Sequence, residues 1–338
     1  MQHDSIDHFR GLASNPRTAV ILAAGRGKRL KSLTLDRSKA MLPIVGKPVV
    51  QRVMETLTAN GLDDFVLVIR PEDWQLVRYF RTESTITARV RFAYQERTLG
   101  MAHALRCAAP LLDGPFILSA CDNLVSVEDV RKLVKRWAEK PLPNGVLTLL
   151  PVEPDRLGSV GIVEMDGPWV NRIIEKPQPE QVTSNISSLP LYCFSERILA
   201  YLEDVPLSPR GEYELQDAIQ MLIEREGNIC GVEINARLTL TNADDLLALN
   251  KHYLDQESSN LRIAMRKLGK ATQIFTPVHI ESGVEIGNGC RLGPYLYIES
   301  GCRIGDGVSL SESVLLGGAV IPARANITGQ VIMAGVEV

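Results

Sequence analysis

The sequence has no apolar run that approaches the roughly 18 residues needed to cross a bilayer, which argues against a membrane-spanning protein. Its first residues, MQHDSIDHFRGLASNPR, lack the apolar core of a signal peptide, so we expect a flexible tail over residues 1–17. Neither sign of charge dominates. The formal net charge of the 338 residues is −3, which argues against a general nucleic-acid-binding surface.

Paired cysteines and clustered histidines are also absent. The six cysteines contain no CxxC pair and the five histidines are isolated, which excludes a disulfide scaffold and a zinc site of the usual spacing. This pattern predicts a reducing, cytoplasmic setting. The hydrophobic content of 45% and the charged content of 23% are typical of globular proteins, and the length is sufficient for two domains.

In the first half of the chain, short continuous apolar runs alternate with amphipathic stretches. The runs are rich in Val, Ile, Leu and Phe, as in strands covered on both faces: TAVILAA, DFVLVIR, VRFAYQ, PFILSAC and GVLTLLPV. Residues 154–235 contain shorter strands and two helices, near 195–203 and 213–226, which we expect to complete a pocket beside the sheet. The predicted fold class is α/β, with a Rossmann-like, mixed but mostly parallel sheet domain over residues 18–241 and a helical linker over 242–270.

The C-terminal part has a six-residue repeat. Aliphatic residues recur at every sixth position from Ile274 to Leu316, and a second column of small or aliphatic residues runs from Val278 to Val320, with Gly, Asn, Ser, Asp and Pro between them. A short strand and a corner in every six residues are the repeat of a parallel β-helix, which we expect over residues 271–338. Cys290 and Cys302 fall in the second column, where we expect them to fill the core.

The basic stretch AVILAAGRGKRLKSLTLDRSKAMLPI, residues 19–44, follows the first predicted strand. It matches neither the P-loop pattern GxxxxGK[ST] nor the dinucleotide pattern GxGxxG, because Leu30 stands where each requires glycine. The glycines would still let backbone N–H groups approach a ligand closely, with Arg29 and Lys39 within reach of it. A solvated charged loop is the alternative, but open α/β sheets bind ligands at the carboxyl ends of their strands.

The stretches LAAGRGKRL and SKAMLPIVGKPVV resemble the nucleotide-binding signature of the sugar-1-phosphate nucleotidylyltransferases. The tail resembles the left-handed β-helix that several members of this family carry, so the resemblance covers nearly all of the chain from Thr18 to Val338. It implies a transferase that joins a nucleoside triphosphate, UTP or dTTP, to glucose 1-phosphate or N-acetylglucosamine 1-phosphate. The product would be a nucleotide-sugar, with release of pyrophosphate and with Mg²⁺ as cofactor.

The same resemblance implies a role for individual residues. Arg29, Lys39 and Lys176 would be catalytic cations at the phosphates, and Asp122 in CDNL would hold Mg²⁺. The nucleotide would contact Ala23, Ala24, Gly25, Gly27, Gln95 and Gly100, and the sugar phosphate would contact Gly161, Glu175, Lys176 and Asn185.

This chemistry depends on charge. The two substrates carry about −4 and −2, and each pair of unit charges near 4 Å costs on the order of 4 kcal/mol at an effective dielectric of 20, so positioned cations matter more than acid–base groups. Asp122 ends an apolar strand, where a carboxylate needs a cation.

Ordinary structural roles also fit some of these residues. Asp122 would fit as a helix cap, Glu175 and Lys176 as an exposed ion pair, and Asn185 as a turn residue. Gln95 would fit as an ordinary surface residue of a strand.

The family's second metal carboxylate has no obvious counterpart in the sequence. Its place is taken by Thr239 or, with a small shift, by Asn242. This departure leaves open a second reading, in which the chain binds nucleotide-sugar as a non-catalytic regulatory homologue. An acetyltransferase in the β-helix is a third reading, but about 65 residues with His279 as the one histidine are too few, so we expect this tail to assemble homo-oligomers.

Overall fold

The structure is a computed structural model that describes residues 15–25, 27–256, 262–263 and 268–335. It divides into two compact units. The first comprises Met1–Gly25 and Val53–Leu238, and the second joins Arg26–Arg52 to Thr239–Val338. Residues 1–14 of the expected tail, and residues 257–261 and 264–267 of the expected linker, lie outside the described residues.

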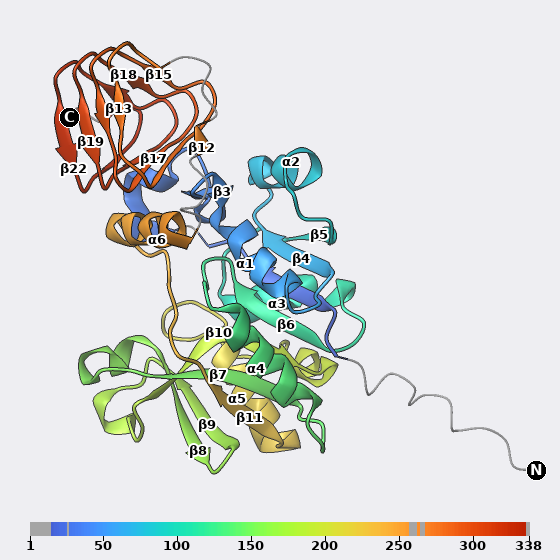
Figure 1. Ribbon diagram of the computed structural model, residues 1–338. Coiled ribbons are helices and arrows are strands. Elements are labelled where there is room, and N and C mark those ends of the chain that lie inside the picture. The colour runs from blue at the N-terminus through green and yellow to red at the C-terminus, as the bar shows by residue number, and fades with distance from the viewer. Residues whose placement is uncertain (1–14, 26, 257–261, 264–267, 336–338) are drawn as a thin grey trace, which may run out of the picture. The chain divides into compact units, whose positions relative to one another are not determined.

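The first unit is built on a nine-stranded mixed sheet of order β5-β4-β1-β6-β10-β7-β11-β9-β8 (Figure 1). Its first four strands are parallel and coincide with predicted apolar runs: β1 (Thr18–Leu22), β4 (Asp64–Ile69), β5 (Arg89–Tyr94) and β6 (Phe116–Ala120). The five further strands are β7 (Gly145–Pro151), β8 (Gly161–Asp166), β9 (Trp169–Glu175), β10 (Ile186–Phe194) and β11 (Ile229–Glu233).

The sheet is less parallel than the alternation of apolar runs predicts. Strand β10 is antiparallel to β6, β7 and β8, and β9 is antiparallel to β8 and β11, whereas β7 and β11 are parallel. The cause is local: β8 and β9 form a hairpin, and short connections of this kind join antiparallel strands. The prediction of a mixed sheet is confirmed, but "mostly parallel" holds only for its first half.

Helices cover this sheet because its strands carry apolar side chains on both faces. Val20, Val66 and Leu118 belong to a buried cluster with α3 (Met101–Ala108) and α5 (Leu215–Glu226), whereas the intervening Ile21 and Leu67 are fully buried on the opposite face. Other helical elements are α2 (Trp74–Thr82), α4 (Val127–Ala138), η3 (Ala109–Leu111), η4 (Pro154–Ser159), η5 (Pro179–Gln181) and η6 (Glu196–Tyr201). The helix predicted near 195–203 is therefore a 3₁₀ helix.

The second unit begins with a stretch that we call the basic segment, residues 27–48. It contains the 3₁₀ helices η1 (Lys28–Thr34) and η2 (Lys39–Met41) and the hairpin of β2 (Pro43–Ile44) and β3 (Lys47–Pro48). Helix α1 (Val49–Thr58) follows it and passes into the first unit at Val53, whereas α6 (Ala243–Gln256) belongs to the second unit.

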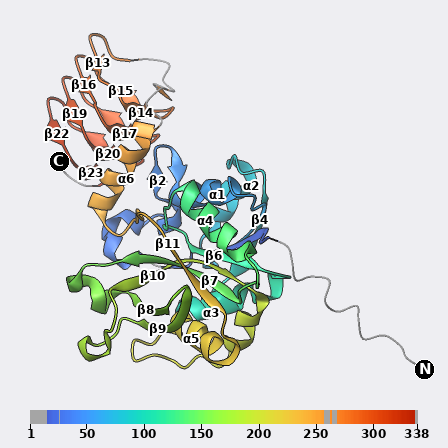
Figure 2. The ribbon, with the colours of Figure 1, turned by 60° about the horizontal axis from the view of Figure 1, so that its bottom comes forward.

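The rest of the second unit is a stack of short parallel strands over residues 273–332, which we call the strand stack. Figure 2 shows β13, β16, β19 and β22 one above another, and two further parallel sheets, β12-β14-β17-β20-β23 and β15-β18-β21, complete it. The bounds are β12 (Arg262–Ile263), β13 (Gln273–Ile274), β14 (Val278–Ile280), β15 (Glu285–Ile286), β16 (Arg291–Leu292), β17 (Leu296–Ile298), β18 (Arg303–Ile304), β19 (Ser309–Ser311), β20 (Val314–Leu315), β21 (Val320–Ile321), β22 (Asn326–Thr328) and β23 (Val331–Ile332).

The register of the strand stack follows a six-residue spacing up to Leu310 and then departs from it. Ile280 pairs with Ile298, 18 residues later, but Ile298 pairs with Leu315 after only 17. The corner at Glu312 and Ser313 is one residue shorter than the corners before it, so the inward positions are Leu315 and Ala319. The prediction of Leu316 and Val320 as inward residues is therefore wrong in register, and Val320 is 59% exposed. The prediction that the repeat fades after Pro322 is also wrong, because β22 and β23 continue it.

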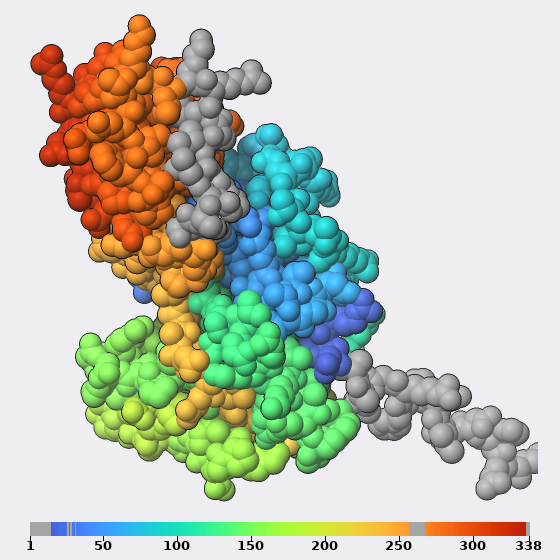
Figure 3. Space-filling view, in the orientation of Figure 1, coloured from blue at the N-terminus to red at the C-terminus, as the bar shows by residue number. Residues whose placement is uncertain are grey.

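The interior of the strand stack is apolar and its exterior polar. Cys290 and Cys302 are fully buried in it, as predicted, and the Cys302 thiol donates to the carbonyl oxygen of Leu316 at 3.2 Å. Outward side chains form the continuous orange-to-red surface of this part of the chain in Figure 3. Among the described residues, none of the helices combines the length and the apolar character that crossing a bilayer requires.

The inward residues of the strand stack should carry its stability. Leu310 is fully buried between Leu292 and Ile327 of the neighbouring coils. We expect Leu310→Ala to lower the free energy of unfolding by about 2–5 kcal/mol, measured by urea denaturation. Val320→Ala, which removes aliphatic carbons from an outward position, should change it by less than about 0.5 kcal/mol. Equal effects of the two substitutions would contradict the observed register.

Candidate functional site

The residues predicted to bind ligands are divided between the two units. The first unit holds Ala23, Ala24, Gly25, Gln95, Gly100, Asp122, Gly161, Glu175, Lys176 and Asn185. The second unit holds Gly27, Arg29 and Lys39, all of which lie in the basic segment.

The carboxyl ends of β1 and β6 bring two predicted ligand loops to one edge of the sheet. Leu22 pairs with Ala120, and the chain continues into Ala23 from β1 and into Cys121 from β6. The Ala23 N–H donates to Val68 of β4 at 2.8 Å, and the Cys121 N–H donates to Leu22 at 3.1 Å. The residues just beyond, Gly25 and Asp122, therefore leave the sheet from adjacent strands. A Cβ built on Gly25 meets no atom within 4 Å, so there is room beside it for a ligand.

Asp122 does not cap the following helix. The N-cap of α4 is Ser126, whose hydroxyl oxygen accepts from the Asp129 N–H at 3.0 Å. Next to Asp122, Asn123 is 2% exposed, and within the described part of the chain neither atom of its amide has a hydrogen-bond partner. Buried amides without partners are rare because each costs about 1–3 kcal/mol, so this turn is suited to a polar ligand.

A divalent cation would have one protein carboxylate at this edge. The described residues contain no group of three or more His, Cys, Asp or Glu that could hold a metal ion. Asp122 with substrate phosphate oxygens nevertheless fits Mg²⁺, which is commonly bound through one or two carboxylates plus phosphates. Asp122 also acts on Arg237. Burial lowers the pKa of the Arg237 guanidinium, and the negative charge of Asp122 opposes that shift.

The two residues proposed for the second metal position are occupied in local contacts. The Thr239 hydroxyl lies 2.9 Å from that of Thr241. The side-chain oxygen of Asn242 accepts from the Asp245 N–H at 2.9 Å, and the Asp245 carboxylate accepts from the backbone N–H of Asn242 at 3.1 Å. This reciprocal pair caps the start of α6, so it accounts for Asn242 without a metal.

Gln95 is buried and its amide has a fixed orientation. Its Nε2 donates to the carbonyl oxygen of Gly100 at 3.1 Å and lies 2.9 Å from Nδ1 of His103. The carbonyl can only accept, so the NH₂ group must face it, and His103 Nδ1 is then the acceptor of the second bond. Burial and the nearby Arg106 lower the pKa of His103, which favours the neutral ring that this requires. The Gln95 oxygen is therefore the atom directed away from His103.

The Gly100 turn depends on the absence of a side chain. Its φ is +100°, and a Cβ there would lie 2.5 Å from the carbonyl oxygen of Tyr213. The backbone of Tyr213 holds both sides of the turn, donating to Leu99 at 2.8 Å and accepting from Ala102 at 3.1 Å. Gln95 and Gly100, which the family resemblance assigns to the nucleotide, therefore belong to one hydrogen-bonded turn.

Gly161, Glu175 and Lys176 also lie together. Gly161 pairs with Glu175 across the β8–β9 hairpin, and a Cβ on Gly161 would lie 3.0 Å from a carboxylate oxygen of Glu175. Burial raises the pKa of Glu175, whereas Lys176, whose Nζ is 3.7 Å from the carboxylate, and Arg210 lower it. Glu175 and Lys176 thus form an ion pair, as the structural alternative expected, in which Lys176 is 42% exposed and Glu175 only 13%. Asn185 is exposed, and its carbonyl accepts from the Val152 N–H at 2.9 Å.

Lys176 adopts a backbone conformation that is rare for its residue type. Its φ is +46°, in the left-handed region that favours glycine, and its N–H donates to Val160 at 3.0 Å. Such residues cost on the order of 1–3 kcal/mol and are concentrated at functional sites.

Three polar residues beside this group were not predicted as site residues from the sequence. Ser188 and Tyr192 are buried, with their hydroxyl oxygens 3.0 Å apart. Gln216 is 4% exposed, its Nε2 would lie 3.4 Å from a Cβ on Gly161, and its Oε1 has no hydrogen-bond partner among the described residues. The available signal for Gln216 was a polar residue on the otherwise apolar face of the helix predicted over 213–226.

The basic segment has little acidity of its own. Neither η1 nor η2 has an acidic residue in its first turn, and Arg29 is exposed. Gly27 has φ +59°, where a Cβ would lie 3.3–3.4 Å from Thr34, Leu30 and Lys39. The hydroxyl of Ser38, beside Lys39, is buried without a hydrogen-bond partner in the described part of the chain. An exposed guanidinium at Arg29 and an unsatisfied hydroxyl at Ser38 suit an anionic ligand.

Comparison with known proteins gives matches to two family models. Residues 18–256 match the family model described as nucleotidyl transferase, and residues 274–338 match the one described as GMPPB C-terminal domain. The UTP–glucose-1-phosphate uridylyltransferase AglF of Haloferax volcanii is 31% identical over 229 residues, which are 67% of this chain and 92% of that relative.

Longer relatives and solved structures also match. The bifunctional protein GlmU of Methanococcus maripaludis is 28% identical over 271 residues, 79% of this chain but only 61% of that relative. The crystal structure of a UDP-glucose pyrophosphorylase complexed with UDP-glucose matches with a TM-score of 0.65 at 20% identity, covering 71% of this chain and 99% of that one, which shows the shared fold. On the family match over residues 18–256, this chain belongs to the nucleotidyl transferase family.

Proposed function

We propose that the protein is a sugar-1-phosphate nucleotidylyltransferase, which condenses UTP or dTTP with glucose 1-phosphate or N-acetylglucosamine 1-phosphate. The observation that carries the proposal is the common sheet edge, where the glycine loop after β1 and Asp122 after β6 leave adjacent parallel strands. Ligands of open α/β sheets bind at such an edge. The names of the relatives AglF and GlmU support the same reaction class.

In the proposed reaction, an oxygen of the sugar 1-phosphate attacks the α-phosphorus of the triphosphate. A new O–P bond forms, the bond to the bridging oxygen breaks, and pyrophosphate leaves with its electron pair. Arg29 would bind the triphosphate with its planar guanidinium group. The backbone at Ala23, Ala24, Gly25 and Gly27 would approach the nucleotide closely. Lys39 and Lys176 would act as point charges at the reacting phosphates.

Asp122 would hold Mg²⁺, and Asn123 would supply the amide beside it. When bound, the ion neutralises negative charge that develops on the phosphate oxygens. Glu175 would accept hydrogen bonds from sugar hydroxyls, with Gln216 and Asn185 as further polar contacts. Lys176 would meet the sugar phosphate.

Gln95 supports a pyrimidine with a protonated ring nitrogen. Its oxygen, directed away from His103, can accept from the N3–H of uracil or thymine, whereas N3 of cytosine carries no proton. Gly100 would contribute backbone contacts to the same base.

We further propose that the strand stack is the left-handed β-helix of the family resemblance and that it assembles homo-oligomers in the cytoplasm. The apolar side chains of Phe275 and Val320 are exposed on it, at 38% and 59%, and unpaired strand edges at the end of the stack favour association. Analytical ultracentrifugation tests this directly.

The reaction is tested by pyrophosphate release over a matrix of four triphosphates and several sugar 1-phosphates. We expect turnover with UTP or dTTP and a loss of about 10²-fold or more in kcat for Asp122→Ala. Asp166→Ala is the control, because Asp166 also ends a strand but is exposed. Binding of nucleotide-sugar without turnover of any pair would favour the regulatory homologue.

Base recognition gives a second prediction. Gln95→Leu should lower kcat/KM for UTP by about tenfold or more, because the ring N–H loses its acceptor, and should leave the KM for the sugar 1-phosphate unchanged. CTP should be a poorer substrate than UTP for the wild type by a similar factor. If the wild type uses CTP as well as UTP, the proposed orientation of Gln95 is wrong.

Glu175 gives a prediction about pH. Its raised pKa means that the folded protein binds this proton more tightly than the unfolded chain, so the stability it contributes is present below about 4.5 and is lost as pH rises through the raised pKa. The free energy of unfolding of the wild type, relative to Glu175→Gln, should therefore fall over that interval. Urea denaturation at a series of pH values measures it, and a difference that rises with pH would contradict the assigned direction.

A further inference from the structure

The basic segment, which carries Arg29 and Lys39, is built of 3₁₀ helices and a hairpin. Both of its helices are short 3₁₀ helices, and neither has a side-chain cap among the described residues. Short 3₁₀ helices have poor hydrogen-bond geometry, so a segment of this kind needs external contacts to be held in one conformation. The question is which residues of the second unit provide them.

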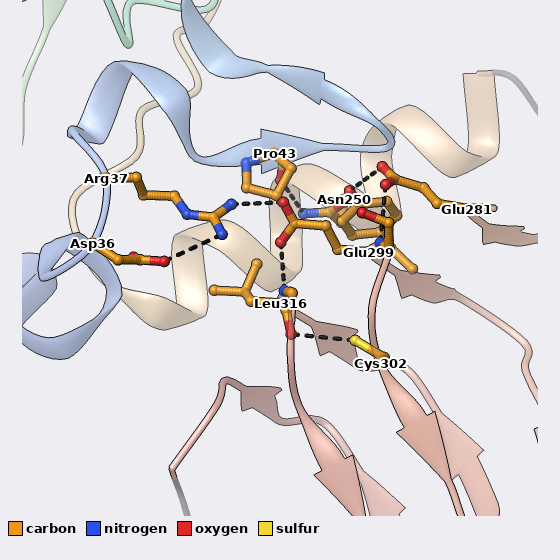
Figure 4. Close-up of polar contacts among 11 residues, drawn as sticks. Asp36, Arg37, Pro43, Asn250, Glu281, Glu299, Cys302 and Leu316 are labelled. Carbon is orange, nitrogen blue, oxygen red and sulfur yellow. Dashed lines mark hydrogen bonds and ion pairs between the residues drawn. The ribbon is translucent and has the colours of Figure 1, made fainter. Parts of the chain in front are cut away.

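The central contact is an ion pair between Arg37 and Glu299. The Arg37 guanidinium donates to one carboxylate oxygen of Glu299 at 2.6 Å, and the two side chains are only 17% and 16% exposed (Figure 4). The other carboxylate oxygen of Glu299 accepts from the Gly317 N–H at 2.6 Å. Glu299 therefore links the basic segment to two successive coils of the strand stack.

Glu299 is itself held in place by the strand stack. It directly follows β17, and its N–H donates to Leu315 of β20 at 2.9 Å. The residues around it are already paired, because the neighbouring Glu281 accepts from the buried Tyr297 hydroxyl at 2.7 Å and from the Ser300 N–H at 3.0 Å. Asp36 reaches Arg37 only at 3.5 Å and is 62% exposed. Glu299 is thus the close, part-buried counter-charge of Arg37.

Beyond Arg37, the hairpin of the basic segment is fixed by other contacts of the same unit. The Asn250 side chain of α6 accepts from the Val45 N–H at 2.9 Å, and Arg52 donates to the Ile44 carbonyl at 2.8 Å. Gly46, at φ +77°, lies against His279 of the strand stack, where a Cβ would be 2.9 Å from the ring. The hairpin is fixed independently of Arg37, so the Arg37 contact bears mainly on the stretch from Arg29 to Lys39.

We infer that Glu299 is a positioning residue for the triphosphate, acting through Arg37 on the stretch that carries Arg29 and Lys39. The inference rests on the proposed function, because it takes those two cations as the triphosphate contacts. It gives the strand stack a part in substrate binding in addition to assembly. Arg37 is two residues from Lys39, so releasing it displaces a charge whose placement must be accurate to within about 1 Å.

The test is the substitution Glu299→Gln, which keeps the shape of the side chain and removes its charge. We expect the Kd for UTP, measured by calorimetry, and the KM for UTP to rise about tenfold or more, with the KM for the sugar 1-phosphate within about twofold of wild type. A merely structural role would lower the active fraction and leave both KM values unchanged. Glu299→Gln should add little in a Lys39→Ala background, because both changes act through the same charge.

The matched control is Glu312→Gln. Glu312 also lies in the strand stack and pairs with Lys251 of α6 at 3.5 Å, but it contacts neither Arg37 nor Arg29 in any described interaction. It should leave the Kd for UTP unchanged. If Glu299→Gln does not fold, as judged by circular dichroism, Arg37→Lys replaces it as the test. This substitution keeps the charge but loses the guanidinium fork, so it should also raise the Kd for UTP.

The outcomes separate this inference from the proposed function. If the wild type turns over no substrate pair but binds UTP, and Glu299→Gln weakens that binding, the reaction is refuted and the positioning role stands. If the wild type is active and a folded Glu299→Gln binds UTP as the wild type does, the positioning role is refuted alone. Absence of both turnover and UTP binding in the wild type overturns both.

Discussion

Strand β1 is hydrogen-bonded along its whole length to β4 on one side and to β6 on the other, with all three strands running in the same direction. Parallel strands place their carboxyl ends at one edge, so the loops after β1 and β6 must leave the sheet side by side. The positions of Gly25 and Asp122 follow from this constraint, and the interior of β1 is occupied by Ala19, Val20 and Ile21, which are fully buried. The chemistry we propose for the edge depends on the apolar packing behind it.

Buried polar groups without partners mark the same regions. Asn123 follows Asp122, Gln216 lies by Gly161, and Ser38 precedes Lys39, and each has at least one buried atom that no described group satisfies. Thr58 and the Nε of Arg70 share this property away from the predicted site, so the property alone does not define a site. Its coincidence with three stretches that the sequence assigns to phosphate, metal and sugar is the informative point, because ligand atoms would offset the cost of desolvation.

How far the sequence predicts this structure depends on the range of the interactions involved. The strands of the first unit were predictable because runs such as DFVLVIR are apolar on both faces, and the repeat of the strand stack was predictable because its period is short. The five-residue step from Leu310 to Leu315 was not, since one missing residue in a corner of Ser and Glu leaves no signal in hydrophobicity. The pairing of Arg37 with Glu299 joins residues 262 positions apart, and no local pattern reports such a contact.

The second unit is composed of two stretches that are far apart in the chain, Arg26–Arg52 and Thr239–Val338. A ribosome releases the first of them some two hundred residues before the second. During synthesis, Arg37 therefore has no carboxylate at Glu299 to meet, and the hairpin at Gly46 has no His279 beside it, until translation is nearly finished. Domains generally form as units in the order in which they emerge, but this one must wait for the end of the chain. A chain that stops before the strand stack would keep the sheet strands and the contacts of Asn250 and Arg52, but would leave Arg37 without its counter-charge Glu299.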